Sequence, residues 1–286
     1  MTEADKNFKI TCEKILNEGY SSSGSGVRTR WADTKEEANY YSIVGVSNKY
    51  DLSKEFPMIT YRNTGVTLPR AIDEVLWIWQ KKSNRVSDLN SKIWDQWVRE
   101  DGTIGKAYGY QMGKKYDFKI NGKLEKMDQV DFVLHLLKND PASRRIMTNI
   151  FNHEELHDMA LEPCVYGTQW LVKEGKLDLI VNQRSQDMLA ANGWNTMQYA
   201  ALAHMFAHIN NYEVGTLTHN IGDCHIYDRH MPMVEELLKQ DTMECSPKLN
   251  IVRKVESFYD FKVDDFEVEG YQYNKNFKLG KIPIAE

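Results

Sequence analysis

Residues 161–199 read LEPCVYGTQWLVKEGKLDLIVNQRSQDMLAANGWNTMQY and bring a thiol, a cation, a carboxylate and an amide into one short stretch. Cys164 follows a proline and opens the apolar segment 165–172, which is typical of a β-strand. A second strand-like run covers residues 176–182, after a Glu-Gly turn signal. Two antiparallel strands joined by this tight turn would bring Arg184 back beside Cys164.

The expected contact between Cys164 and Arg184 indicates how this site could react. A nearby guanidinium favours the thiolate, which is the form of cysteine that attacks carbon. The same guanidinium can bind a phosphate. The stretch therefore predicts a nucleophilic cysteine that acts on a phosphorylated substrate, with Ser185 and Asp187 close behind the cation.

Length, composition and charge narrow the class of protein. The chain has 286 residues, 42% of them hydrophobic, and we expect one domain over residues 1–286. The beginning of the chain has no apolar signal segment, and no apolar run approaches the ~20 residues that span a bilayer, so we expect a cytoplasmic protein without membrane contact. Four widely spaced cysteines indicate reduced thiols. A net charge of −5 argues against a nucleic-acid surface, so an anionic substrate would need a local cluster of arginines.

Hydrophobic periodicity predicts a mixture of helices and strands, an α/β protein of the α+β type. The expected helices cover residues 3–18, 128–138, 196–209 and 231–239, and a further helix begins at residue 68. The other expected strands cover residues 40–50, 56–61, 146–151, 214–221 and 248–255. If the strand from residue 214 continues, His225 and Tyr227 point to the same face.

Several polar and aromatic residues stand out before any family is considered. Glu74 lies among apolar positions, so it either occupies a partly exposed flank or is buried and used as an acid or base. Trp94 and Trp97 are typical of plain core, while Tyr108 follows in a glycine-bearing loop.

Three arginines outside the central stretch are candidate anion ligands. Arg28 lies in a Ser/Gly-rich segment that lacks the Gly-Lys-Ser/Thr ending of a P-loop, and is expected to be an exposed cation. Arg144 and Arg145 stand together before the strand at 146–151. Such a pair is either solvated, binds a phosphate, or contacts a partner subunit.

Two patterns resemble metal sites. Residues 153–157 read HEELH, which matches the H-E-x-x-H zinc pattern of metallopeptidases. Pro163 leaves little room for the long helix that this pattern needs, and no third ligand follows at a convincing distance. The cluster of His219, Cys224, His225 and His230 has spacings that match no standard zinc finger. We therefore expect no metal.

A family resemblance emerges from motifs along the whole chain. These motifs are DEVLWIWQ (73–80), IWDQW (93–97), EDGTIGKAYG (100–109), NDPASRRIM (139–147), LEPCVYGTQW (161–170), QRSQDM (183–188), NIGDCHIYDRH (220–230) and FYDFKVDDFEVEGY (258–271). In this order they resemble the folate-dependent, cysteine-using thymidylate synthases, from Arg28 to the last residue. The resemblance implies a homodimer built on a large bent β-sheet with surrounding helices, in which the sheets of the two subunits pack back to back.

The resemblance also implies roles for individual residues. The residues implied in catalysis are Cys164 as nucleophile, Glu74 and Tyr108 in proton transfer, and Asn195. Those implied to hold the nucleotide are Arg28, Arg184, Ser185, Asn195, His225 and Tyr227, with Arg144 and Arg145 reaching the same phosphate from the other subunit. Those implied in the folate pocket are Trp94, Trp97, Asp187, Ala191, Trp194 and, in the closing tail, Ala285.

The implied reaction is one-carbon transfer from 5,10-methylenetetrahydrofolate to C5 of dUMP, which gives dTMP and dihydrofolate. Uracil C5 is a poor nucleophile, and addition of a thiolate at C6 activates it as an enolate. The resemblance also implies uracil rather than cytosine, because Asn195 is retained where cytosine-using relatives tend to carry aspartate.

Departures from the family pattern keep an alternative open. Ala191 replaces a usual glycine, Trp194 replaces a usual phenylalanine, and Glu286 replaces an apolar last residue. All three lie on the folate side or in the tail. If these changes admit water, the product would be 5-hydroxymethyl-dUMP with tetrahydrofolate regenerated, as in the hydroxymethylases of the same superfamily. A non-catalytic binding module is a third hypothesis.

Overall fold

The stretch around Cys164 forms the middle of a six-stranded sheet in the computed structural model, which describes residues 1–285. β6 (Val165–Lys173) and β7 (Lys176–Asp187) pair antiparallel, as predicted. The two residues between them, Glu174 and Gly175, have φ of 50° and 77°. Two consecutive positive φ angles match the strand twist of a two-residue hairpin, so the local sequence sets the register next to the turn. A β-bulge between Val165 and Gly167 shifts the register by one residue at the Cys164 end.

The sheet is mixed because one neighbouring pair is parallel. Its order is β1-β2-β8-β7-β6-β5, and its remaining strands are β1 (Tyr20–Ser21), β2 (Tyr40–Asp51), β5 (Met147–Asn149) and β8 (Glu213–Tyr227). β7 and β8 run parallel, whereas every other neighbouring pair in this sheet is antiparallel. The chain returns from β7 to β8 through a helix, as a parallel connection requires.

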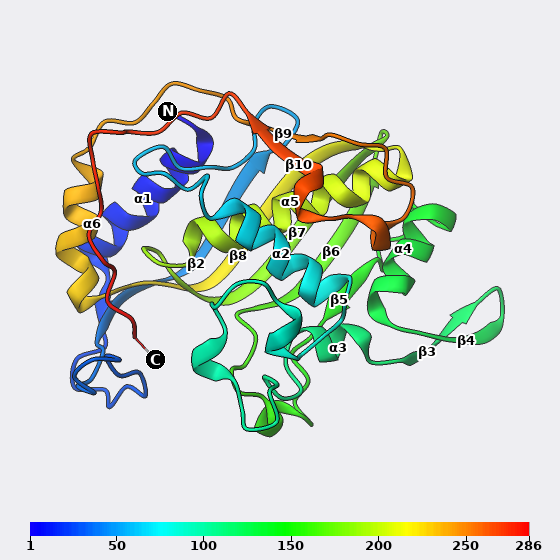
Figure 1. Cartoon of the computed structure of the whole chain (residues 1–286), viewed down its shortest axis with the longest axis horizontal. Helices are drawn as coiled ribbons and strands as arrows, with labels where there is room; N and C mark the ends of the chain where they lie inside the picture. The colour runs from blue at the N-terminus through cyan, green and yellow to red at the C-terminus, as the bar shows by residue number, and fades with distance from the viewer. Residues whose placement is uncertain (286) are drawn as a thin grey trace.

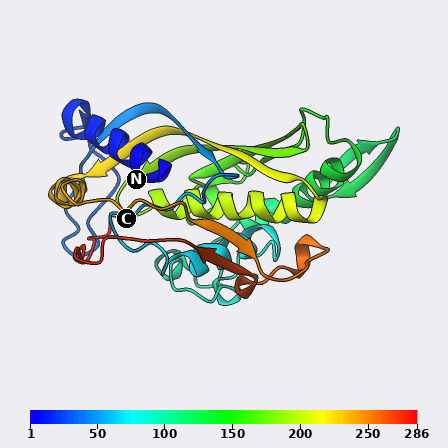
Figure 2. The ribbon, with the colours of Figure 1, turned by 90° about the horizontal axis from the view of Figure 1, so that it is seen from above.

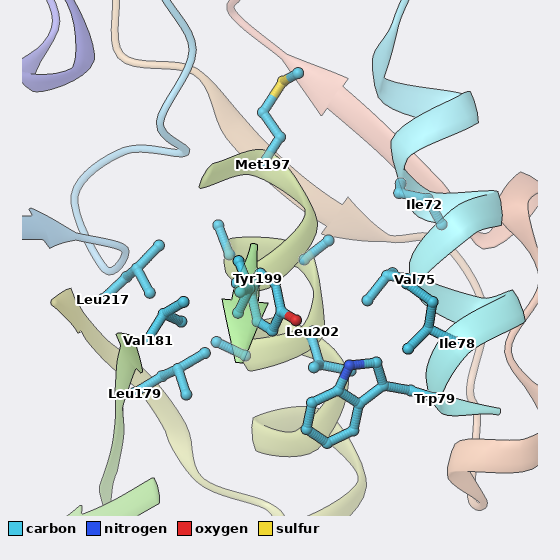
Figure 3. Close-up of a cluster of buried hydrophobic side chains, with 14 of the residues drawn as sticks. Ile72, Val75, Ile78, Trp79, Leu179, Val181, Met197, Tyr199, Leu202 and Leu217 are labelled. Carbon is cyan, nitrogen blue, oxygen red and sulfur yellow. The ribbon is translucent and has the colours of Figure 1, made fainter. Parts of the chain in front are cut away.

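That helix, α5 (Asn192–Asn210), packs against one face of the sheet. Figure 2 shows α2 (Leu68–Trp79) beyond α5, so the layers on this side are sheet, α5 and then α2. The core between them is aromatic and aliphatic, and Figure 3 shows part of it: Ile72, Val75, Ile78, Trp79, Leu179, Val181, Met197, Tyr199, Leu202 and Leu217. Each such side chain stabilises the fold by about 2 kcal/mol when fully buried. This packing fixes α2 and the start of α5 relative to Cys164.

The remaining elements lie around this layered centre (Figure 1). They are α1 (Glu3–Glu18), α3 (Gly109–Gly113), α4 (Gln129–Asn139), α6 (Met231–Leu238), the hairpin of β3 (Tyr116–Ile120) and β4 (Lys123–Met127), and the pair of β9 (Lys248–Ile251) and β10 (Phe266–Glu269). The buried hydrophobic side chains form one cluster, and we propose on this basis that the chain is one domain.

The strand expected at residues 56–61 is absent, and this prediction was wrong. Phe56 and Met58 are buried, but the segment is irregular. Pro57 has no N–H to donate to a ladder, and the backbone bonds with loops and side chains instead. The N–H of Phe56 donates to Pro247 O, and that of Thr60 donates to the carboxylate of Asp5 at 2.6 Å. Apolar composition predicted the burial of this segment but not its pairing.

The face of the sheet away from α5 is bare over its central strands. Figure 2 shows no helix covering β6 and β7 on that side within the described chain. A polar ladder crosses it, in which Ser47 Oγ donates to Asn220 Oδ1 at 2.8 Å and Asn220 Nδ2 donates to Asn182 Oδ1 at 3.2 Å. A shallow hollow of about 540 Å³ spans β2, β8, β7 and the start of β6 there.

Within residues 1–285, no helix has the length and apolar character that crossing a membrane requires. The cytoplasmic location remains a prediction from the sequence.

Candidate active site

The hairpin brings Arg184 beside Cys164, as the sequence predicted. The backbone N–H of Arg184 donates to Cys164 O at 2.8 Å. Its guanidinium donates to the carbonyls of Pro163 at 3.0 Å and Glu162 at 2.8 Å, so the cation is held against the turn before the thiol. β8 passes close to this point, because a Cβ on Gly222 would lie 2.9 Å from Arg184 O. Glycine at this position permits the close approach.

Burial has the largest effect on the ionisation of Cys164 in the ligand-free protein, and the thiolate expected from the sequence remains a prediction. Burial raises the pKa of the Cys164 thiol, and this effect outweighs the lowering by the Arg184 charge and by a hydrogen bond with Tyr108. A buried anion costs more than one guanidinium restores when that guanidinium already donates to backbone carbonyls. Burial therefore favours the neutral thiol over the thiolate in the ligand-free protein.

Tyr108 reaches Cys164 from a tightly held loop. The backbone N–H of Cys164 donates to the Tyr108 hydroxyl at 3.0 Å, and burial raises the pKa of that hydroxyl. Tyr108 has a φ of +43°, which is unusual for a residue with a side chain and is typical of functional sites. Gly109 lets the loop pass close to Ser83, since a Cβ there would lie 2.0 Å from Ser83 O.

Glu74 is buried, so the alternative of a partly exposed flank was wrong. The side chain is on α2 and the residue is 6% exposed. Its Oε1 accepts from the indole N–H of Trp94 at 2.5 Å, and its Oε2 accepts from that of Trp194 at 2.5 Å and from Gln198 Nε2. Burial raises the pKa of Glu74, and the three N–H donors act in the opposite direction. The negative charge of Glu74 also raises the pKa values of Cys164 and Tyr108, so the three groups are close enough to belong to one site.

The amide of Asn195 is oriented by two glutamines that the sequence reasoning missed. Gln183 Nε2 donates to Asn195 Oδ1 at 3.4 Å, and Asn195 Nδ2 donates to Gln198 Oε1 at 3.2 Å. Gln183 is itself oriented by the buried His219, whose Nε2 lies 2.8 Å from Gln183 Oε1. A signal existed in the sequence: Gln198 follows Asn195 by three positions on one helix, so both lie on the same face.

The candidate nucleotide ligands of β7 and β8 lie side by side. Ser185 pairs with Asp223 in the parallel ladder, and its Oγ lies 3.5 Å from His225 Nδ1. β8 continues beyond the strand expected at 214–221 to Tyr227, so the condition for a common face of His225 and Tyr227 holds, and their rings are 5.0 Å apart. Burial raises the pKa of Tyr227, while the charge of Arg28 lowers it, which places the exposed Arg28 at the same end of the sheet.

A single chain does not bring Arg144 and Arg145 into this group. Both are exposed, and none of the hydrogen bonds or ion pairs among residues 1–285 joins either of them to Cys164, Arg184 or Ser185. Arg145 instead borders a hollow of about 680 Å³ between the β3–β4 hairpin and β5.

Comparison with known proteins identifies the family of the chain. A sequence model of the family described as thymidylate synthase matches residues 6–282. The chain is 46% identical over 276 residues to thymidylate synthase 1 of Bacillus subtilis strain 168, and 45% identical over 276 residues to the thymidylate synthase of Bacillus phage phi3T, with 96% of each chain covered in both cases. The solved structure of thermostable thymidylate synthase A from Bacillus subtilis superposes with a TM-score of 0.91, at 44% identity and 99% coverage of both chains.

The chain belongs to the thymidylate synthase family. Thymidylate synthases are one-carbon transferases, so the protein is an enzyme of that class, and the mixed sheet with its helices is the fold of the family.

The residues that the thymidylate synthase pattern assigns to folate surround the Glu74 region. The rings of Trp94 and Trp97 are 5.2 Å apart, and Trp94 also packs on Tyr108 at 5.1 Å. Ala191 is the N-cap of α5 and is half-buried, and Trp194 follows in the first turn. Flat aromatic side chains beside a small residue fit a pterin ring, which binds by stacking.

Asp187 and the tail are joined through His230. The carboxylate of Asp187 accepts from the N–H groups of Leu189 at 2.8 Å and Ala190 at 3.0 Å, and its Oδ2 lies 3.6 Å from His230 Nδ1. The other ring nitrogen of His230 lies 2.8 Å from Pro283 O. Ala285 pairs with Trp31 in an antiparallel bridge, so the tail is docked beside the loop that begins at Asp187.

The zinc interpretation of HEELH is not compatible with the structure. Residues 153–155 form a turn and Leu156–Asp158 a 3-10 helix, so the two histidines are not one α-helical turn apart. Glu155, which lies between the two histidines, accepts hydrogen bonds from Lys114 at 2.8 Å and Gln111 at 3.0 Å. Across the described chain, no group of three or more His, Cys, Asp and Glu residues is arranged to hold a metal ion.

Proposed function

We propose that this enzyme transfers the one-carbon unit of 5,10-methylenetetrahydrofolate to C5 of dUMP and yields dTMP and dihydrofolate. The observation that supports this most directly is the position of the Cys164 thiol, between the Arg184 guanidinium on one side and Tyr108 and buried Glu74 on the other. A nucleophile, a phosphate ligand and two proton-transfer groups are what addition to a pyrimidine nucleotide requires.

The first step follows from the state of the thiol. Arg184 and the hydroxyl of Ser185 are available to hold the nucleotide phosphate, which positions the ring above Cys164. As the Cys164 sulfur bonds to C6, the ring C5–C6 double bond becomes an enolate, and the thiol proton passes to a neighbouring base. When bound, methylenetetrahydrofolate supplies the one-carbon unit and the reducing hydride. Glu74 and Tyr108 are placed to move the protons.

The preference for uracil rests on the fixed amide of Asn195. Gln183 donates to the Asn195 oxygen, and Gln198 accepts from the Asn195 nitrogen. If the amide were flipped, the donor of Gln183 would face the Asn195 NH2 group and the acceptor of Gln198 would face the Asn195 oxygen, so both hydrogen bonds would be lost. In its present orientation the amide offers N–H to O4 of uracil and its oxygen to N3–H. Cytosine presents the reverse pattern, and we expect dCMP to be rejected.

The bare sheet face supports the proposal of a homodimer. Tyr166 borders the hollow in this face and is 37% exposed, and Val44 in β2 is 74% exposed. Back-to-back packing of two such faces would remove this surface from water. In such a dimer Arg144 and Arg145, which are free of the site in one chain, would serve the phosphate site of the other.

The test is to incubate the protein with dUMP and methylenetetrahydrofolate and to identify the nucleotide product by mass, with dihydrofolate followed by absorbance. We expect dTMP and dihydrofolate in equal amounts, and no product from Cys164→Ala. The altered residues Ala191 and Trp194 make hydroxymethylation the second candidate. A hydroxymethyl product without dihydrofolate would establish it and refute the synthase reaction. Absence of any product would favour a binding module.

A further inference from the structure

Trp194 contacts the candidate proton-transfer group directly. Its indole N–H lies 2.5 Å from Glu74 Oε2, and Gln198 donates to the same oxygen. The family resemblance puts phenylalanine at this position, and a phenylalanine has no N–H to donate. This chain therefore carries a hydrogen bond to Glu74 that the usual residue cannot make.

The carboxylate of Glu74 is surrounded by donors. Trp94 donates to Oε1, while Trp194 and Gln198 donate to Oε2. A protonated carboxyl would have to turn its own O–H toward one of these N–H groups, whereas the ionised form accepts all of them. The donors come from two segments, since Trp94 precedes a 3-10 turn and both Trp194 and Gln198 are on α5, while the acceptor Glu74 is on α2.

We propose that Trp194 is a positioning residue that fixes the orientation and the ionised form of Glu74 for proton transfer, a role separate from any contact with the folate. This inference rests on the proposed function, because it assigns Glu74 to the proton transfers of that reaction. It also gives a second role to the tryptophan that replaces the usual phenylalanine at position 194. The sequence alone assigned this residue only to the folate pocket.

Other titratable groups act on Glu74 as well. The charge of Asp73 on the same helix raises the pKa of Glu74. Cys164, Tyr108 and, on α5, Tyr199 face it from the other elements, and burial raises the pKa of each. These three groups are therefore uncharged near neutral pH and leave Asp73 as the neighbouring charge.

Replacing Trp194 by phenylalanine tests the proposal with little change in shape. Trp194→Phe keeps an aromatic ring but removes one donor to a charged acceptor, so the pKa of Glu74 should rise. We expect the limb of the pH profile of kcat that Glu74 controls to move to higher pH by about one unit, equivalent to a tenfold change in the proton affinity of Glu74. The matched control is Trp97→Phe, whose indole belongs to the same aromatic group but is not among the donors to Glu74 found in residues 1–285.

The two variants separate the two roles. A shift of the limb in Trp194→Phe with no shift in Trp97→Phe supports the positioning role. A raised KM for the folate with an unmoved pH profile in Trp194→Phe would overturn it, because Trp194 would then act only as part of the folate pocket. Equal shifts in both variants would also overturn it, since the effect would follow from general loss of packing.

A measurement on the ligand-free wild-type protein does not depend on turnover. In protein labelled with 15N at the indole nitrogens, the N–H resonances of Trp94 and Trp194 should titrate together as Glu74 is protonated. Glu74→Gln should abolish that titration. A Trp194 resonance that is insensitive both to pH and to Glu74→Gln would overturn the proposal. If the enzyme made no dTMP but the titration was observed, the hydrogen bond would stand and only the proposed reaction would fail.

Discussion

At the scale of single residues, the site is governed by opposing effects of burial and charge. Burial raises the pKa values of Cys164, Glu74 and Tyr108, while N–H donors and the Arg184 cation favour the ionised forms of the first two. At Cys164 the net effect is a raised pKa of the thiol. A raised pKa lowers the fraction of thiolate, which is the form of cysteine that oxidants and alkylating reagents attack.

Alkylation of Cys164 tests this balance. Because the pKa of the thiol is raised, its reaction with iodoacetamide should be slow at neutral pH and accelerate through the alkaline range. Arg184→Gln should slow the reaction about tenfold at a fixed pH, since loss of the nearby positive charge raises the pKa further. Mass spectrometry of the peptide that contains Cys164 measures the rate.

The control for that experiment is Arg184→Lys, which keeps the positive charge and should restore most of the rate. If Arg184→Gln and Arg184→Lys react equally fast, the charge of Arg184 has no influence on the thiol and the electrostatic argument is refuted.

At the scale of elements, the β6–β7 hairpin places Arg184 opposite Cys164. Its turn is formed by Glu174 and Gly175, both with positive φ. Glutamate rarely adopts a positive φ, and two-residue turns with two positive φ angles prefer the sequence Asn-Gly. Because the register of the pair depends on this turn, its residues act on the site from the far end of the hairpin.

Glu174→Asn should therefore stabilise the protein by roughly 0.5 to 1 kcal/mol, since asparagine tolerates the left-handed region better than glutamate. Gly175→Ala should destabilise it by about 1 kcal/mol or more for the same reason. Urea unfolding at one fixed protein concentration measures both. If Glu174→Asn and Gly175→Ala have equal free energies of unfolding, the backbone conformation of the turn does not affect the stability of the protein.

At the scale of the whole molecule, the proposed phosphate site needs two chains. Arg144→Glu and Cys164→Ala should each inactivate the homodimer. When the two variants are mixed and allowed to exchange subunits, one site in each heterodimer would combine an intact Cys164 with an intact Arg144. Random exchange makes half of the dimers mixed, so we expect about a quarter of the wild-type activity. Recovery of no activity in proven heterodimers would refute the shared site.

Stability of the whole molecule should fall in acid because of His219. Burial lowers the pKa of His219 from 6.5 to about 4. Between these two pH values the unfolded chain binds a proton at His219 that the folded protein does not, so protonation favours unfolding. The loss from this group is about 1.4 kcal/mol per pH unit within that window, and about 2 kcal/mol between pH 6.5 and pH 5.

His219→Gln removes this titration, so its unfolding free energy should fall less steeply between pH 6.5 and pH 5 than that of the wild type. Urea unfolding at both pH values and at one protein concentration gives the comparison. Parallel pH dependence of the two proteins would show that His219 is not neutral in the folded state.

The sequence by itself determined the features that depend on short-range pattern. The hairpin and the common face of His225 and Tyr227 follow from turn residues and from the two-residue period of a strand. The turn brings Arg184 near Cys164, but the final register there depends on a β-bulge between Val165 and Gly167 that no local signal announced. The strand expected at residues 56–61 failed because apolar composition indicates burial but does not name a pairing partner.

Only the tertiary structure decided the hydrogen bonds and the pKa values of the groups in the site. Glu74, Trp94 and Trp194 come from α2, a connecting turn and α5, and no local pattern reports that their side chains converge on one carboxylate. The raised pKa of Cys164 likewise depends on how many neighbours exclude water from the thiol. Periodicity fixes which face a residue occupies, whereas burial, pKa and hydrogen bonding depend on packing between distant segments.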